Sequence, residues 1–125
     1  MDREWLRKVL ELARKLVSRG WIQGDFTRGE GQMQTWCMWG AIMEAARYDP
    51  RTEINHEEAN VIEEMFKNHS IGKTSIIKFN DELGRTQMEV VVAFDAVIAS
   101  LHPPAEPEPE RLFQNVPAAE EPVPA

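Results

Sequence analysis

The sequence predicts an all-α protein, a compact bundle of about four helices followed by a tail rich in proline and glutamate. Two observations predict the bundle: apolar residues recur at helical spacing, and capping patterns precede two of the apolar stretches. No convincing pair of strands can be recognised. Seven of the eight prolines lie after residue 102, so we expect a helical domain over residues 1–101 and a disordered or extended acidic tail over residues 102–125.

The first helix is expected over residues 2–19. Its apolar stripe has helical spacing and is formed by Trp5, Val9, Leu12 and Leu16. Gly20 is a natural C-cap. Residues 20–34 contain four of the seven glycines and are expected to form a loop, with Trp21, Ile22 and Phe26 tucked beneath it.

The second helix is expected over residues 35–48, with Thr35 as its N-cap. Every residue from 36 to 46 is apolar or glycine except Glu44, and a helix that is apolar nearly all round is buried nearly all round. We therefore expect this helix to be central, with Gly40 allowing close approach of a neighbouring segment. Large side chains on and near this helix are interpreted first as core residues and second as the lining of a ligand pocket or a partner surface. They are Met33, Trp36, Met38, Trp39 and Met43.

Two further helices follow. Asn55 with Glu58 forms a capping-box pattern, which predicts a third helix from residue 55 to about His69. Residues 75–79 are expected to form a helical turn. Thr86 with Glu89 forms a second capping box, and the apolar stripe behind it predicts a fourth helix over residues 87–101.

Composition and charge exclude several classes of function. The net charge is -7 and no basic stripe is present, which argues against nucleic-acid binding. The apolar runs are too short for a membrane span, and the charged N-terminus does not resemble a signal peptide. The single cysteine cannot form an internal disulfide, so we expect a cytoplasmic protein. The histidines lack ligand spacing, so we expect no metal and no cofactor.

Two polar segments are the candidates for chemistry. Asn80 and Asp81 are interpreted first as turn residues whose side chains bond nearby backbone amides, and second as polar groups in a cleft beside the loop at residues 23–25. Cys37 is either a nucleophile near a helix N-terminus or, as we favour, a buried structural residue. We assign no catalytic residue. The second interpretation predicts a candidate pocket formed by Trp21, Gln23, Asp25, Cys37, Asn80 and Asp81.

The tail contains one apolar island, residues 110–116, within its proline- and glutamate-rich surroundings. Such islands bind a partner or fold back on their own domain. The side chains expected to make that contact are Leu112, Phe113 and Val116.

Three short stretches resemble a known family. They are GWIQGDF at residues 20–26, WCMWGAI at residues 36–42 and FNDELGRTQMEVVVAFDAVIA at residues 79–99. The chain resembles, over about residues 5–101, an uncharacterised family of small proteins of bacteria and their phages. The resemblance implies an α-helical fold and a bacterial or phage origin, and it implies no reaction. It marks eight positions: Trp21, Gln23, Gly24, Cys37, Gly40, Asn80, Asp81 and Thr86.

The favoured functional hypothesis is a non-enzymatic protein-interaction module, such as a phage accessory or virion-associated protein. It would bind a protein partner through its helical surface, its acidic tail or both. Its location would be the cytoplasm, which is the host cytoplasm if a phage encodes it, or the virion. One alternative is a small-molecule-binding protein or enzyme that uses the candidate pocket, and another is a homo-oligomeric structural protein.

Overall fold

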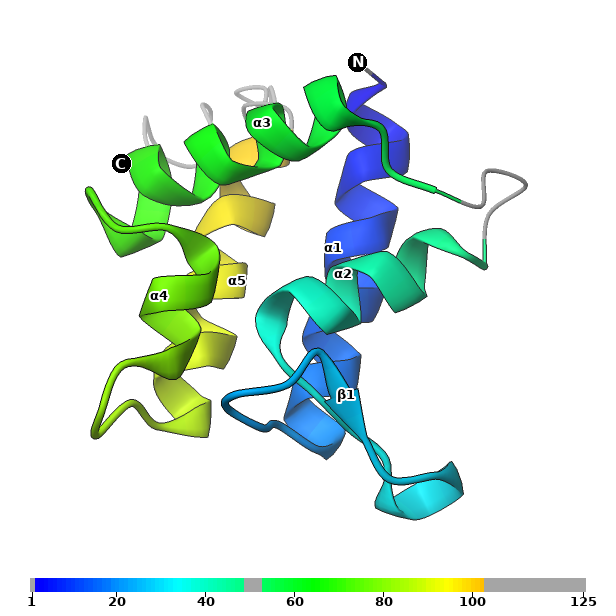
Figure 1. Cartoon of the computed structure of the whole chain (residues 1–125). Helices are drawn as coiled ribbons and strands as arrows, with labels where there is room; N and C mark the ends of the chain where they lie inside the picture. The colour runs from blue at the N-terminus through cyan, green and yellow to red at the C-terminus, as the bar shows by residue number, and fades with distance from the viewer. Residues whose placement is uncertain (1, 49–52, 103–125) are drawn as a thin grey trace, which may run out of the picture.

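The computed structural model describes residues 2–48 and 53–102, and the helical class is confirmed there (Figure 1). Five α-helices carry the fold, and they are α1 (Arg3–Arg19), α2 (Met38–Ala46), α3 (His56–Phe66), α4 (Ile76–Asp81) and α5 (Gln87–Leu101). The shorter elements are β1 (Thr27–Arg28), the 3₁₀ turn η1 (Gly31–Met33), β2 (Thr35–Trp36) and the π-helical turn η2 (Lys67–Ile71).

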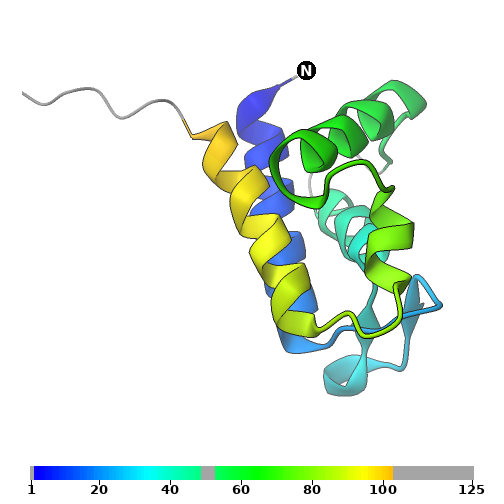
Figure 2. The same ribbon diagram turned by 90° about the vertical axis from the view of Figure 1, so that its left-hand side faces the viewer.

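Helices α1 and α5 lie side by side and run in opposite directions (Figure 2). At one end Arg3 donates hydrogen bonds to the carbonyls of Ser100 and Leu101, and at the other Gln87 donates to the carbonyl of Val17 at 2.7 Å. Helix α2 packs on α1 and α4 packs on α2, while α3 packs on α5. The first and last helices thus form one layer, and the middle of the chain forms the layer in front of it.

The core lies between these layers. Helix α2 is the most completely buried helix, with seven of its nine residues buried, as its composition predicted. Phe66 and Phe94 meet edge to face with ring centroids 5.2 Å apart, which joins α3 to α5. Gly40 of α2 lies against the backbone of Phe26, where an added Cβ would sit 1.8 Å from the carbonyl oxygen. The loop can therefore approach α2 this closely only because position 40 is glycine.

Helix α2 begins later than the sequence predicted, because an unpredicted β-hairpin precedes it. Thr35 pairs with Arg28 in the hairpin and is not the N-cap. The cap is Cys37, whose sulfur accepts a hydrogen bond from the Gly40 N–H at 3.3 Å. Trp36 also exchanges backbone hydrogen bonds with the segment after α1, donating to Gly20 and accepting from Ile22. This pairing holds residues 35–36 extended and leaves the helix to begin at residue 38.

The remaining helix starts agree with their capping patterns. Asn55 and Thr86 each form the complete capping box that the sequence predicted. Helix α3 gives way at Phe66 to the π-helical turn, which carries the chain on to Ile71, and the expected turn at residues 75–79 is the short helix α4.

The C-terminal tail lies outside the described residues except for His102. The apolar island with Leu112, Phe113 and Val116 therefore stays a prediction from the sequence. Among the helices of residues 2–48 and 53–102, none has the length and apolar character needed to cross a lipid bilayer.

We predict that Gly40→Ala destabilises the protein. Alanine is intrinsically better than glycine in a helix by about 1 kcal/mol, so free space at position 40 would give a more stable variant. The contact with Phe26 instead predicts a loss of about 1–3 kcal/mol in the free energy of unfolding. Urea denaturation measures the sign, and Met43→Ala on the same helix, at a 40 % exposed side chain, is the control.

Candidate functional site

Asn80 is the centre of a polar junction between distant parts of the chain. Its side chain is 1 % exposed. The amide oxygen accepts hydrogen bonds from the indole N–H of Trp21 at 2.7 Å and from the backbone N–H of Met38 at 3.0 Å. The amide nitrogen donates to the carbonyl of Ile22 at 3.1 Å and to the Asp81 carboxylate at 2.8 Å. The buried amide thus uses two donor and two acceptor positions.

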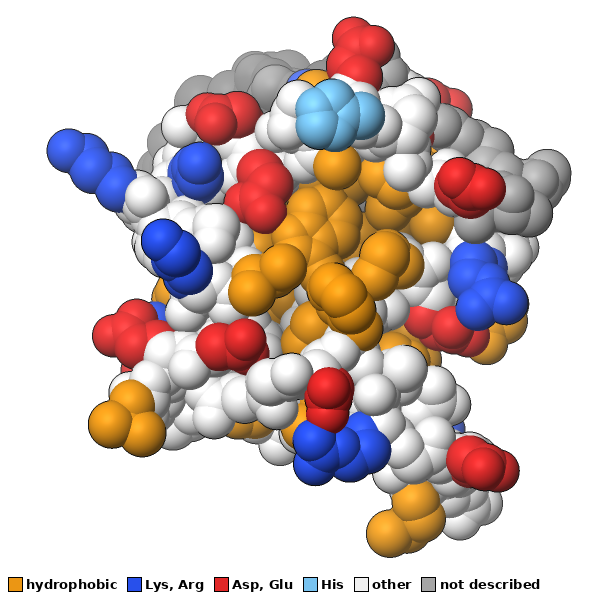
Figure 3. All heavy atoms as spheres, in the orientation of Figure 1, with side chains coloured by type: hydrophobic (Ala, Val, Ile, Leu, Met, Phe, Trp, Pro, Cys, Tyr) orange, Lys and Arg blue, Asp and Glu red, His pale blue; other side chains and the backbone are white. Residues whose placement is uncertain are grey.

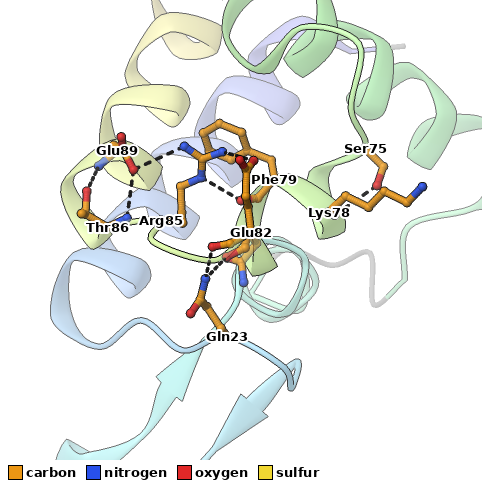
Figure 4. A network of polar contacts seen from close by, with 9 residues as sticks. Gln23, Ser75, Lys78, Phe79, Glu82, Arg85, Thr86 and Glu89 are labelled. Carbon is orange, nitrogen blue, oxygen red and sulfur yellow. Dashed lines mark hydrogen bonds and ion pairs between the residues drawn. The ribbon is translucent and has the colours of Figure 1, made fainter.

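Further hydrogen bonds attach the loop after α1 to the same place. Gln23 donates from its amide nitrogen to the carbonyls of Asn80 at 2.9 Å and Glu82 at 2.8 Å (Figure 4). Gly24 donates its backbone N–H to the Asp81 carboxylate at 3.0 Å, and its φ of 89° is a conformation that favours glycine. We call Trp21, Ile22, Gln23, Gly24, Met38, Asn80 and Asp81 together the Asn80 junction.

The junction corrects our favoured interpretation of Asn80 and Asp81. These residues were expected to bond nearby backbone amides, yet apart from the contact between them their bonds reach residues 42–59 positions away along the chain. Asn80 is the penultimate residue of α4, where a buried amide can face three segments at once. The side chains of Asn80 and Asp81 therefore join the loop after α1, the start of α2 and the end of α4.

The candidate pocket of the sequence analysis is found only in part. Asp25, Cys37, Asn80 and Asp81 line a small recess of about 210 Å³, together with Gly24, Phe26 and Ile77. Trp21 and Gln23 do not line it, because their side chains are engaged in the junction. Asp25 forms an ion pair with Arg28 at the surface. The recess is smaller than the roughly 300–1,000 Å³ of ordinary ligand pockets.

Cys37 has the environment of a structural cysteine. Its side chain is 5 % exposed, and its sulfur caps α2 through the Gly40 N–H. Burial raises the pKa of the thiol above its ordinary value, although the hydrogen bond from the Gly40 backbone opposes that shift. A raised pKa disfavours the thiolate, which is the nucleophilic form. The surroundings of Cys37 therefore favour the structural interpretation.

A second polar cluster, which the sequence analysis did not find, fixes the turn between α4 and α5 (Figure 4). The Arg85 guanidinium lies 3.6 Å from the centre of the Phe79 ring and donates to the Phe79 carbonyl at 2.8 Å. It also pairs with Glu82 at 2.7 Å and Glu89 at 3.3 Å. The backbone N–H of Thr86 and the Arg85 guanidinium together lower the pKa of Glu89. This cluster sets the position of the junction relative to α5.

An apolar hollow of about 630 Å³ lies between α2, α3, α4 and the loop before β1 (Figure 3). We call it the tryptophan pocket. Three of its side chains are well exposed: Phe26 at 53 %, Ile77 at 43 % and Met43 at 40 %. Trp36 and Trp39 are buried side chains in its wall. Ile54 and Ala59 line the side formed by α3 and the residues before it.

Hydrogen bonds hold the wall of the tryptophan pocket in place. The Trp39 indole N–H donates to the Glu63 carboxylate at 2.9 Å, and the same carboxylate accepts from the Ile76 backbone at 3.1 Å. Glu63 thereby joins α2, α3 and the first residue of α4. Within residues 2–48 and 53–102, the Trp36 indole N–H is buried without a hydrogen-bond partner.

Charged groups surround the apolar surface of the pocket (Figure 3). Glu44 and Glu53 line it together with Arg47, and Glu44 pairs with Arg47 at 3.5 Å. One carboxylate is thus in excess among these three side chains. Across the described residues, no group of three potential metal-ligating side chains is present.

The tryptophan pocket contains only some of the residues that the sequence suggested for a pocket. Trp36, Trp39 and Met43 were considered as pocket residues, and they line it. Met38 is fully buried and Met33 is 80 % exposed outside it. Phe26 was expected to tuck under its loop and instead stands 53 % exposed at the pocket. The signal that could have indicated this is the position of Phe26, a large aromatic residue within a glycine-rich segment and directly before β1.

The fold and these two sites define a small all-α domain with a buried polar junction and an open apolar pocket. The chain belongs to a family of unknown function, DUF6197, whose profile matches residues 1–100. This agrees with the resemblance seen in the sequence to an uncharacterised family. Comparisons with curated proteins and with solved structures gave no match.

We predict that Asn80→Ala lowers the free energy of unfolding by about 2–4 kcal/mol, because it leaves the Trp21 indole and the Met38 N–H without their acceptor in a buried place. Asp81→Ala is the comparison. It removes the acceptor of the Gly24 N–H and of one Asn80 amide hydrogen, but Asp81 is exposed and water can take its place, so the change should cost about 1 kcal/mol. Equal losses in urea denaturation would contradict a dominant role for the buried amide.

We predict that the Cys37 thiol reacts with a disulfide reagent at least about tenfold more slowly in the native protein than in denaturant. The cause is burial, which blocks access and raises the thiol pKa. Because the thiol pKa is higher in the folded chain, the unfolded chain loses the thiol proton at a lower pH than the folded chain does. The free energy of unfolding should therefore fall as the pH rises above about 9. Fast native labelling at neutral pH would revive the nucleophile hypothesis.

Proposed function

We propose that the protein is a non-enzymatic interaction module that binds a protein partner in the tryptophan pocket. The observation that carries this proposal is the pocket itself, where aromatic and aliphatic side chains gather in an open hollow of about 630 Å³. Exposed apolar patches of this kind on a soluble domain mark binding surfaces. Tryptophan-lined pockets are also where the binding energy of interfaces concentrates.

The partner is a peptide segment with one or two large apolar side chains next to a basic residue. The apolar side chains match the surface formed by Phe26, Met43 and Ile77. A basic neighbour matches the excess of carboxylate given by Glu44 and Glu53 over Arg47. It also matches the overall net charge of -7, which attracts basic partners during diffusion.

The arrangement of the pocket favours a partner over a catalytic role. Of the charged side chains that line it, Glu44 pairs with Arg47, and Glu63 next to the pocket holds Trp39 and the start of α4. A rigid wall lowers the ordering cost of binding. The alternative of a small-molecule site at Cys37, Asn80 and Asp81 has weaker support, because that recess is about 210 Å³ and its amide is already saturated.

We place this activity in the cytoplasm of a bacterium, or of an infected bacterial host if a phage encodes the protein. The acidic composition and the single buried cysteine support a reducing compartment. A role as a phage accessory or virion-associated factor fits a small module that acts by binding.

The proposal predicts that the immobilised full-length chain selects, from a random peptide display library, peptides with an aromatic or large aliphatic residue beside Lys or Arg. Met43→Glu and Ile77→Glu should each weaken binding of a selected peptide at least about tenfold, because they place a carboxylate in the apolar surface. Fluorescence titration measures the affinity.

The control is Val92→Glu, which changes a 54 % exposed side chain on α5 outside the pocket. It should leave peptide affinity unchanged. All three substitutions are at exposed positions, and circular dichroism checks that each variant keeps the fold. Peptides that bind wild type and Met43→Glu equally well, or a library that yields no binder, would contradict the proposal.

A further inference from the structure

We propose that the tryptophan pocket binds this chain's own apolar island, residues 110–116, so that the tail competes with the partner for the same surface. This inference rests on the proposed function and names a regulator of the same pocket. The observations that carry it are the chemistry of the island, the place where α5 ends and the length of chain between them.

The island has the chemistry that the pocket takes. Leu112 and Phe113 are large apolar side chains, Val116 adds a third, and Arg111 is a basic residue directly beside them. The remaining residues from 103 to 125 are mostly proline, glutamate and alanine, so this is the apolar part of the tail with an aromatic anchor. Glu110 lies on the other side of Arg111, so the island carries no net charge, and its apolar side chains make the match with the pocket.

The tether reaches far enough. Leu112 lies ten residues beyond His102, where α5 has ended. At about 3.1 Å per residue for a proline-rich chain, that linker spans about 31 Å. A domain of about 100 residues has a radius of gyration of about 13 Å. Helix α5 packs on α3, and Ala59 of α3 lines the pocket, so the linker starts beside a helix that carries part of the pocket wall (Figure 1).

A tethered segment needs little intrinsic affinity. A short linker gives it an effective concentration in the millimolar range. Proline at positions 103, 104, 107 and 109 restricts the backbone before binding and so reduces the entropy that docking removes. A weak contact by Leu112 and Phe113 is therefore enough to cover the pocket for much of the time, and a partner has to displace it.

The test compares full-length chains that differ only in the tail. The double variant Leu112→Ser with Phe113→Ser removes the anchors, and Val123→Ser is the matched control. Methyl NMR signals of Met43, Ile54 and Ile77 should shift in the double variant and not in the control. A pocket-binding peptide from the display selection should bind the double variant about 2–10-fold more tightly than wild type.

The outcomes separate this inference from the proposed function. Unchanged methyl signals and peptide affinity in the double variant, with Met43→Glu still losing the peptide, would overturn the cis contact alone. A peptide that binds every variant equally would overturn both proposals. The methyl shifts should also be independent of protein concentration, whereas shifts that vanish on dilution would assign the pocket to a second copy and contradict binding in cis.

Discussion

The buried amide of Asn80 is the interaction on which the rest of the domain depends. A polar group taken out of water costs free energy unless its hydrogen bonds are replaced. This amide replaces them with groups from the loop after α1, from the start of α2 and from its neighbour Asp81 on α4. Each segment is thereby fixed in position and register relative to the others. Apolar packing alone tolerates small displacements that such directional bonds do not.

The junction also positions the tryptophan pocket. Ile77 lies about one helical turn before Asn80 on α4, and Met38, whose N–H binds the amide, directly precedes Trp39 of the pocket wall. The contact of Gly40 with the Phe26 backbone sets the third wall. The Asn80 junction thus builds a frame, and the surface that we propose binds a partner is carried by side chains beside it.

The sequence predicted the features that depend on local chemistry. Capping boxes at Asn55 and Thr86 and the apolar stripes located the long helices, and the all-apolar run marked α2 as buried. Features that depend on distant partners were missed. Thr35 was predicted as the N-cap of α2 because it precedes the apolar run. In the structure residues 35–36 are instead held extended by pairing with β1, Gly20 and Ile22, and this pairing cannot be read from the local sequence. The tryptophan pocket was only partly foreseen, because which face of α2 stays open depends on where α3 and α4 pack.

The sequence separation within the junction has a consequence for biosynthesis. Trp21 and Gln23 are made early, yet their partners Asn80 and Glu82 leave the ribosome almost sixty residues later. Until then water must satisfy the hydrogen bonds of the Trp21 indole and the Gln23 amide. The domain therefore acquires its final shape late in synthesis, when α4 and then α5 arrive.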